Sequence, residues 1–424
     1  MTMRAQTLAQ KLVARAAGVG AVTPGAIVTC RVDLAMMHDS GGPRRVKPML
    51  EKLGAKVWDP DKVVVVTDHY VPAHDADSRA IVQIARDWVK DVGITRFHDT
   101  QGICHVVLPQ KGHLRPGLFA VGGDSHSPTG GAFGAYMFGV GATEMLGVLV
   151  TGEIWLKVPH TIRMHWDGRL APGVSAKDMM LHLCGRFGMD GGQYQAVEYA
   201  GEAVRALSMQ ERMTLSNMTA ELGGQAGLIA PDAVTAEWLA GVGVHDVDTT
   251  HWHTDEGATL LADHRLDAST LAPQVAAPHS PAQSQAVGAF AGTAVDIAYV
   301  GACTGAKLDD LRMAAQVLRG QRVATGVRLM VAPASAADQA QAADEGTLGA
   351  LLDAGAELLP NACGACAGYG ANVFGENTVA ISTTARNFKG RMGADSSQVY
   401  LASPFTVAAS AIAGRIVDAR EMLA

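Results

Sequence analysis

The sequence predicts an α/β protein built on parallel strands. Several apolar runs have the length of a strand, most are followed by a turn and then a helical pattern, and glycine is frequent, with 48 of 424 residues. Hydrophobic residues make up 48% of the chain and charged residues 18%, which excludes a disordered, collagen-like or coiled-coil protein. At about 150 residues per domain, the length suggests about three domains.

Five apolar runs are expected to form strands: 63–67, 118–121, 295–300, 327–332 and 378–382. A helix is expected after the third run, because Leu308, Leu311, Ala315 and Leu318 fall on one side of it. Polar or reactive residues follow these runs, among them Asp68-His69, Asp124-Ser-His126, Cys303 and Arg386. Open α/β sheets bind ligands at the carboxyl ends of their strands, so these residues are candidates for a functional site.

Two changes in composition suggest domain boundaries. Residues 272–286 contain three prolines and no charged side chain, which is typical of a linker. A weaker boundary is expected near Lys157-Val-Pro159, after a glycine-rich tract. We therefore expect domains over residues 1–160, 161–280 and 281–424.

Charge and cysteine content narrow the possible functions. The net charge is −7 and no dense Lys/Arg cluster occurs, so the surface needed to neutralise nucleic-acid phosphates is not expected. Six cysteines are too sparse for a disulfide framework, which favours a reducing cytoplasm. The tract 125–143 has no charged side chain, but it is broken by Pro128 and several glycines, so it does not predict a membrane span.

Residues 1–32 contain basic but no acidic side chains. This composition is found in transit peptides and also in basic amphipathic helices. The helical stripe of Leu8, Leu12 and Val13 favours a helix that the first domain buries.

Cys363 and Cys366 form a Cys-x-x-Cys motif, and Cys303 also lies at the end of an expected strand. Three thiolates are one short of the four ligands of structural zinc or of a ferredoxin-type cluster. On a [4Fe–4S] cluster, the open position would leave one iron free to act as a Lewis acid. The motif alone leaves three possibilities: such a cluster, zinc with a histidine as fourth ligand, or a redox pair or plain buried thiols.

Histidines near carboxylates form a second pattern, with Asp68-His69, Cys104-His105 and Asp124-Ser-His126. A carboxylate that accepts a ring N–H fixes the tautomer and suits the other nitrogen to proton transfer. Any single one of these histidines could equally be a structural residue. Asn217 and Glu221 are four residues apart and would share a helix face, for which the residues alone favour an exposed polar surface over a cleft.

Arg386 and Arg391 flank a turn after the last expected strand. Two guanidinium groups at one site suit a substrate with several carboxylates, and surface solvation is an equally good alternative. Three other motifs are rejected. Gly139-Val-Gly141 lacks the third glycine of a dinucleotide site, His251-Trp-His253 is a lone pair in a polar loop, and Gly123-Asp-Ser-His-Ser127 lacks the second glycine of a serine nucleophile elbow.

Together these segments resemble the aconitase superfamily, and within it the large subunits of 3-isopropylmalate dehydratase and their close relatives. The resemblance runs from about residue 4 to about residue 422, and its motifs occur in family order. The segments that carry it are Gly102-Ile-Cys-His105, Gly122-Gly-Asp-Ser-His-Ser-Pro-Thr-Gly-Gly131, Ala302-Cys-Thr-Gly305, Cys363-Gly-Ala-Cys366 and Arg386-Asn-Phe-Lys-Gly-Arg-Met-Gly393.

The resemblance implies three doubly wound α/β domains around a central cleft. It implies a [4Fe–4S] cluster held by Cys303, Cys363 and Cys366, and reversible dehydration of a 2-hydroxy di- or tricarboxylate. It implies that His69 with Asp68 protonates the leaving hydroxyl and that two supporting pairs assist, His105 with Asp124 and His126 with Glu221. The positions that match substrate contacts are His38, Ser125, Arg386 and Arg391.

The resemblance also implies a separate small subunit, because in aconitase the serine base lies on a further swivelling domain, for which we expect no counterpart here. The chain departs from the family at Ala302, Gly305, Lys307 and Ala385, where members have Ser, Asn, Arg and Asn. At Ala302, Gly305 and Ala385 small apolar groups thus replace polar side chains that tune a cluster, so we expect effects on cluster stability and substrate.

Three functions are consistent with these residues and with the resemblance. The leading one is an iron–sulfur hydro-lyase acting on 3-isopropylmalate, in leucine biosynthesis, or on 2,3-dimethylmalate, homoaconitate or the citraconate and maleate pair. A metal-sensing binding protein on the same scaffold is the non-enzyme alternative, motivated by the departures from the family. A serine hydrolase using Ser125 is the third and weakest.

Overall fold

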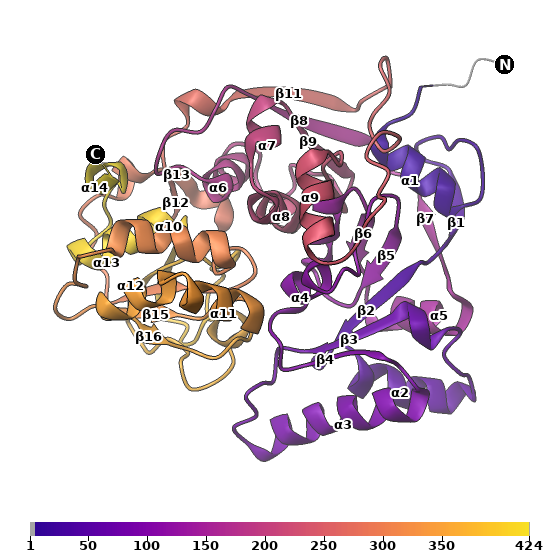
Figure 1. The fold of residues 1–424 in the computed structure, drawn as a ribbon, viewed down its shortest axis with the longest axis horizontal. Helices are drawn as coiled ribbons and strands as arrows, with labels where there is room; N and C mark the ends of the chain where they lie inside the picture. Colours follow the sequence, from indigo (N-terminus) through magenta and orange to yellow (C-terminus); the bar gives the residue numbers. More distant parts are fainter. Residues whose placement is uncertain (1–4, 424) are drawn as a thin grey trace.

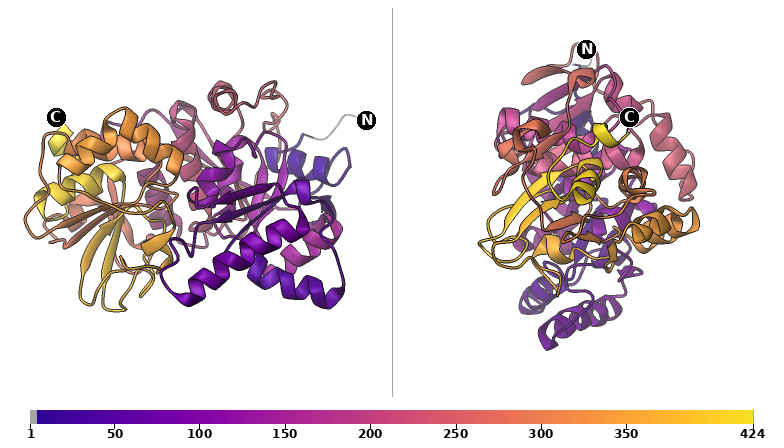
Figure 2. Two further views of the ribbon diagram at one scale, coloured as in Figure 1. Left: turned by 60° about the horizontal axis from the view of Figure 1, so that its bottom comes forward. Right: turned by 90° about the vertical axis from the view of Figure 1, so that its left-hand side faces the viewer.

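Three parallel or mostly parallel sheets organise the chain, of which this computed structural model describes residues 5–423. The first sheet and its helices lie at the lower right of Figure 1, the second sheet at the top, and the third, in orange and yellow, at the left. Figure 2 shows that the third sheet and the first lie side by side, with the N- and C-terminal ends on opposite sides of the molecule. The α/β fold expected from the sequence is confirmed.

The first sheet has five parallel strands in the order β4-β3-β2-β5-β6. All of β3 is buried, because helices cover both faces of the sheet. The order reverses between β2 and β5, which makes this the switch point of a doubly wound sheet. The strands are β2 Leu34–His38, β3 Val63–Thr67, β4 Arg96–Asp99, β5 Phe119–Gly122 and β6 Tyr136–Gly139, and the helices are α1 Leu8–Ala16, α2 Pro43–Leu53, α3 Ala76–Val92, α4 Cys104–Gln110 and α5 Ala142–Thr151.

Helix α1 belongs to the core of this part of the chain. Thr7 caps it by accepting the N–H of Gln10, and Leu8, Leu12 and Val13 are fully buried. The buried-helix interpretation of this segment is therefore correct. A separate antiparallel ribbon joins β1, Ile27–Arg31, to β7, Glu153–Lys157.

The second sheet has four parallel strands in the order β10-β9-β8-β11. Its helix α8 ends at Asn217 and continues as a 3₁₀ turn towards Glu221. The strands are β8 Thr161–Asp167, β9 Ala196–Ala200, β10 Ala226–Leu228 and β11 Ala262–Asp267, and the helices are α6 Ala176–Phe187, α7 Glu202–Ala206, α8 Met209–Asn217 and α9 Ala233–Gly241.

The third sheet has the order β13-β12-β18-β17-β14-β15-β16, in which β18 to β16 are parallel and β12 pairs antiparallel with both β18 and β13. Its parallel part reverses order between β14 and β17, a second switch point. The strands are β12 Gln274–Ala276, β13 Ser284–Ala286, β14 Ile297–Val300, β15 Arg328–Val331, β16 Glu357–Leu358, β17 Val379–Ser382 and β18 Gln398–Ala402, and the helices are α10 Leu308–Leu318, α11 Ala336–Asp344, α12 Thr347–Asp353, α13 Pro404–Ala413 and α14 Arg420–Leu423.

The five predicted strands are all present, as β3, β5, β14, β15 and β17, with ends shifted by at most two residues, and the helix predicted from Leu308 to Leu318 is α10. The segment 272–286 is more ordered than a linker, because β12 and β13 lie within it and β12 pairs with β18. Among residues 5–423, no helix combines the length and the apolar character needed to cross a bilayer.

Candidate active site

The candidate site lies where the carboxyl ends of the first and third sheets face each other. His38 ends β2 and Asp39 follows it, while Asp124 and Ser125 follow β5, so both pairs flank the switch point of the first sheet. Glycine is required beside this turn, since a Cβ on Gly139 would lie 2.7 Å from the carbonyl oxygen of Asp124.

Asp68 and His69 follow β3 and are joined side chain to side chain. The His69 Nδ1 lies 2.6 Å from Asp68 Oδ1, and the backbone N–H of Cys104 donates to Asp68 Oδ2 at 2.7 Å. Burial disfavours the Asp68 carboxylate, but His69 outweighs it and lowers the Asp68 pKa to about 2. Asp68 therefore stays ionised and orients the imidazole, leaving Nε2 on the side of Asp124, whose Oδ2 lies 3.9 Å away.

Burial also disfavours the His69 imidazolium. The neighbouring Cys363 thiol group and Asp68 more than compensate and raise the His69 pKa well above its ordinary value. The His38 ring stacks on His69 with centroids 4.1 Å apart, and its own pKa is lowered by burial and by His69. The two stacked rings therefore favour one proton on His69 over one on His38.

Asp39 fixes the loop that carries His69, and the sequence analysis missed it. Its carboxylate accepts the backbone N–H groups of Asp68, His69 and Tyr70 at 3.3, 3.0 and 2.7 Å. The available signal was its position directly after an apolar strand and beside His38.

Asp124 is shared by several histidines. Its Oδ1 lies 2.7 Å from His105 Nε2 and accepts the backbone N–H of His126 at 2.8 Å, while Oδ2 lies 3.9 Å from His69 Nε2. Burial works against the carboxylate, but His105 and His126 hold the Asp124 pKa well below its usual range. Asp124 is thus an anion beside Nε2 of His69.

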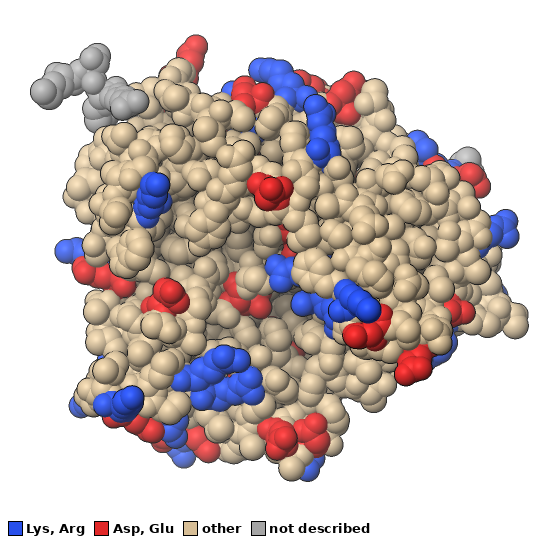
Figure 3. Space-filling model, turned by 180° about the vertical axis from the view of Figure 1, so that it is seen from behind, with Lys and Arg blue, Asp and Glu red and all other residues tan. Residues whose placement is uncertain are grey.

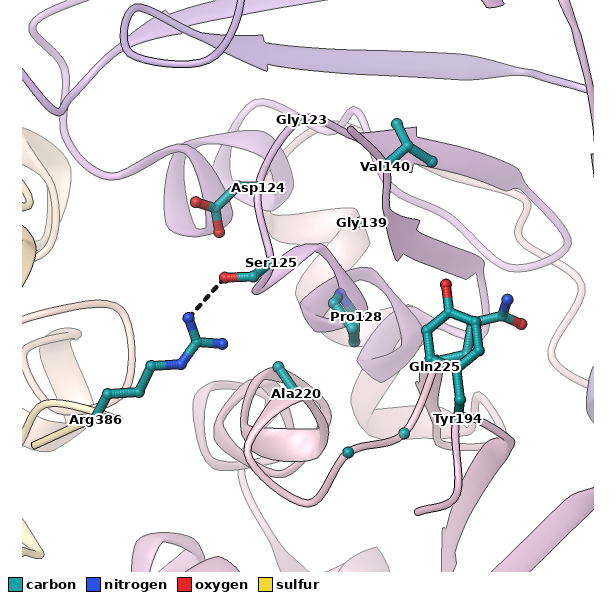
Figure 4. Close-up of a pocket in the computed structure, with 12 residues that line it drawn as sticks. Gly123, Asp124, Ser125, Pro128, Gly139, Val140, Tyr194, Ala220, Gln225 and Arg386 are labelled. Atoms are coloured by element: carbon teal, nitrogen blue, oxygen red, sulfur yellow. Dashed lines mark hydrogen bonds between the residues drawn. The ribbon is translucent and has the colours of Figure 1, made fainter. Parts of the chain in front are cut away.

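Glu221 joins the second sheet to the other two. His126 Nε2 lies 2.9 Å from Glu221 Oε1, and Arg386 donates to the same oxygen through Nε. Burial opposes ionisation of Glu221, but His126 and Arg386 lower its pKa. Arg386 also donates to Ser125 Oγ at 2.9 Å, as the dashed line in Figure 4 shows.

An open cleft of about 370 Å³ lies beside this arginine. Asp124, Ser125 and Arg386 lie at one end of it, and Tyr194 and Gln225 lie at the other. In Figure 3 the molecular surface is hollowed near the middle of one face, with basic and acidic side chains on the rim. The cleft is large enough for a small organic acid.

The three cysteines lie across from His69. Cys303 follows β14, whereas Cys363 and Cys366 follow β16 on a short 3₁₀ turn. Burial and the nearby Cys366 and Cys363 raise the pKa of the Cys303 thiol. All six cysteines of the chain are free thiols, and Asn217 Nδ2 donates to Cys303 Sγ at 3.2 Å.

Asn217 and Glu221 are fully buried, so the exposed polar surface favoured for them in the sequence analysis was wrong. Helix α8 packs against residues 127–133, which connect β5 to β6, and Asn217 at its end donates to Thr129 Oγ1 there, so its last turn points into the protein. Asn217 Oδ1 and Glu221 Oε2 are buried without a hydrogen-bond partner among the described residues.

Arg391 is the sequence-predicted residue that the structure ties least to the site. Its Nε is buried without a hydrogen-bond partner in the described part of the chain, and no ion pair joins it to the other site residues. His251 and His253 lie exposed on a loop, as expected for a polar loop. Ser125 accepts from Arg386, and among residues 5–423 no histidine is hydrogen-bonded to its hydroxyl, which argues against a serine nucleophile.

The model of the aconitase family (aconitate hydratase) matches residues 10–294 and 285–414 of this chain. The chain belongs to the aconitase family. As such it is a hydro-lyase, an enzyme that removes and adds water. It is 44% identical to the 3-isopropylmalate dehydratase large subunit 1 of Methanopyrus kandleri, over 99% of this chain and 100% of that protein.

Other relatives of this aconitase-family enzyme are nearly as similar. The 3-isopropylmalate dehydratase large subunit of Moorella thermoacetica is 40% identical over 98% of this chain and 99% of its own. The probable methanogen homoaconitase large subunit of Methanothermobacter thermautotrophicus is 40% identical over 96% of each chain. The crystal structure of Thermococcus kodakaraensis aconitase X has a TM-score of 0.50 at 13% identity, covering 85% of this chain and 84% of that one, and shows a similar fold.

Proposed function

We propose that this chain is the large subunit of a two-subunit iron–sulfur hydro-lyase that reversibly dehydrates a 2-hydroxy di- or tricarboxylate, with 3-isopropylmalate as the leading candidate. One observation carries the proposal: the buried pair of Asp68 and His69 lies against the Cys363 thiol, and Asp124, 3.9 Å from His69 Nε2, lines the same open cleft as Arg386. The names of the relatives support the substrate class and the small-subunit partner.

The donor set suits an iron–sulfur cluster. Cys303, Cys363 and Cys366 are free, largely buried thiols that influence one another's ionisation. Asn217 donates to the Cys303 sulfur, a contact of the kind that stabilises thiolate ligands. When bound, a [4Fe–4S] cluster with one iron not held by cysteine supplies a Lewis acid for a hydroxyl and a carboxylate.

The spacing of the sulfurs supports a multi-iron cluster over a single zinc ion. A tetrahedral zinc holds its sulfur ligands about 3.8 Å apart, because each Zn–S bond is about 2.3 Å long. Among the described residues, the groups of metal-ligating side chains whose ligand atoms all lie within 4.8 Å of one another contain no cysteine. At least two of the three sulfurs therefore lie farther apart than the ligands of a single zinc ion.

The proton steps are assigned to the buried pairs. His69, protonated and held by Asp68 through Nδ1, donates its Nε2 proton to the departing hydroxyl, which leaves as water. A base on the proposed small subunit takes the proton from the neighbouring carbon, and the electron pair of that C–H bond forms the double bond. The anion of Asp124 beside Nε2 stabilises the charged imidazolium before the transfer. The pairs of His105 with Asp124 and of His126 with Glu221 hold these groups in place.

Arg386 and Ser125 are assigned to substrate binding. The guanidinium uses Nε on Glu221 and one terminal nitrogen on Ser125, so its second terminal nitrogen has no bond within the described residues. A carboxylate entering the cleft would accept from that nitrogen and from the Ser125 hydroxyl. We assign His38 and Arg391 supporting roles in substrate binding, from the family pattern.

Anaerobic purification with a co-expressed small subunit tests the proposal. We expect a brown protein with about four irons and four sulfides per large subunit, and hydration of at least one acid from a panel of isopropylmaleate, dimethylmaleate, homoaconitate, citraconate and maleate. A colourless protein with stoichiometric zinc and no turnover would instead support the metal-sensing alternative. Full turnover by the large chain alone would refute the two-subunit assignment.

A further inference from the structure

A buried lysine outside the catalytic groups connects two loops of the site. Lys177 lies in the first turn of α6, and only 2% of its surface is exposed. Its Nζ donates to the carbonyl oxygens of Thr384 and Thr383 at 2.6 and 2.9 Å and lies 3.4 Å from Thr304 Oγ1. A lysine this deeply buried is rare unless it is paired.

The two loops flank the switch point of the third sheet. The loop after β14 carries Cys303 and Thr304, and the loop after β17 carries Thr383 and Arg386. The Thr304 hydroxyl donates to the Thr383 carbonyl at 3.0 Å, and Thr383 Oγ1 donates to the carbonyl of Gly301 at 2.9 Å. Lys177 therefore contacts both the loop that carries Cys303 and the loop that carries Arg386.

The loops are packed too closely to leave room for a larger side chain between them. A Cβ on Gly305 would lie 2.1 Å from Thr383 Cβ and 2.7 Å from the Thr383 carbonyl oxygen. This close approach lets the ammonium of Lys177 reach Thr304 and both threonine carbonyls at once.

Among residues 5–423, no carboxylate contacts the ammonium of Lys177. All three of its acceptors are neutral, whereas the other buried lysine nearby, Lys307, lies 2.6 Å from Asp310 Oδ2 and donates to the Cys303 carbonyl at 3.1 Å. Burial lowers the Lys177 pKa to about 8, against the opposing effect of Glu221. At neutral pH the ammonium is still largely charged, and it interacts electrostatically with Cys303.

We propose that Lys177 is a positioning residue that fixes the Cys303 loop against the Arg386 loop and supplies the buried positive charge that balances an anionic group bound between them. The loop-fixing part rests on the contacts alone, and the charge-balancing part rests on the proposed function.

Amide hydrogen exchange of the cluster-free chain tests the loop-fixing role without reference to activity. In Lys177→Met, which keeps the length of the side chain, we expect exchange at 301–306 and 383–387 to rise about tenfold, with the exterior of α3 unchanged. In Lys177→Gln, which can still donate to a carbonyl, we expect a partial rescue. Unchanged exchange in Lys177→Met would overturn the role.

If Lys177→Met does not fold, Thr304→Val removes the hydroxyl that contacts both Lys177 and the Thr383 carbonyl. It should loosen the same two segments, and unchanged exchange there would equally overturn the role.

The midpoint potential of the loaded cluster tests the charge. Removing a nearby cation disfavours the more negative, reduced state, so Lys177→Met and Lys177→Gln should both shift the potential to more negative values. The double variant Lys307→Met with Asp310→Asn removes a buried pair with no change in net charge, and should shift the potential much less. An equal shift in both would overturn the charge-balancing role. A wild type without any cluster would refute the proposed function and leave the exchange result standing.

Discussion

The backbone N–H of Cys363 donates to the carbonyl oxygen of Asp68 at 2.9 Å. This bond joins the Cys-x-x-Cys loop of the third sheet to the loop of the first sheet that carries His69. The thiol that we assign to the cluster and the imidazole that we assign to proton transfer therefore belong to one hydrogen-bonded unit. A shift of either loop would therefore move His69 and Cys363 together.

Replacement of Cys303 by alanine should abolish cluster assembly. We expect anaerobically reconstituted Cys303→Ala to lose at least about three-quarters of its iron and its visible absorption, because one of three thiolate ligands is gone. Cys184→Ala is the matched control, since Cys184 is also a fully buried free thiol but lies in α6 away from the other thiols. Wild-type iron content in Cys303→Ala would disprove the three-thiolate assignment.

Replacement of Asp68 by asparagine should separate proton transfer from cluster binding. The neutral amide no longer stabilises the His69 imidazolium, so we expect kcat to fall by about 10² to 10⁴ while iron and sulfide content stay at the wild-type level. Steady-state rates and metal analysis on the same sample measure both. A near-normal kcat in loaded Asp68→Asn would remove this pair from the mechanism.

Much of the fold could be predicted from the sequence because strand-length apolar runs such as Val63–Thr67 are buried on both faces and carry an unambiguous signal. Strands such as β2 were missed, since Leu34–His38 ends in a histidine and its apolar run is short. The sequence of 272–286 is typical of a linker because three prolines lie beside the two three-residue strands β12 and β13 and obscure their pattern.

The site was harder to predict where it depends on packing between sheets. Cys303 and His69 follow apolar runs that the sequence predicts as strands, so their place at strand ends could be predicted. The burial of Asn217 depends on where α8 packs, and the role of Lys177 depends on two loops nearly 80 residues apart that meet at its ammonium. Neither relationship produces a local sequence pattern. The sequence therefore suggested an exposed Asn217 and did not single out Lys177.

Replacement of Arg386 by lysine should weaken substrate binding despite the retained charge. A lysine cannot donate to Glu221, Ser125 and a substrate carboxylate from one planar group, so we expect KM to rise at least about tenfold. Arg312→Lys on α10 is the control, because Arg312 forms a two-bond ion pair with Glu345 on the exposed surface. Equal KM values for wild type and Arg386→Lys would exclude Arg386 from the binding site.

The stability of the cluster-free chain should depend on pH through Lys177. The pKa of this lysine is lowered from an ordinary 10.5 to about 8 by burial, so between these values the unfolded chain binds a proton that the folded chain has lost. Stability therefore rises with pH across this window, and burial of the charged form costs most below it.

Between pH 7.5 and pH 10.5, which together span this window, we expect the free energy of unfolding of wild type to rise by up to about 3 kcal/mol relative to that of Lys177→Met. Urea unfolding of both proteins under reducing, metal-free conditions measures the two free energies of unfolding at each pH. Subtracting one from the other removes the contribution of the cysteines and tyrosines that both chains contain. Parallel profiles would mean that Lys177 keeps an ordinary pKa in the folded protein, and a profile of opposite slope would mean that a buried anion pairs with it.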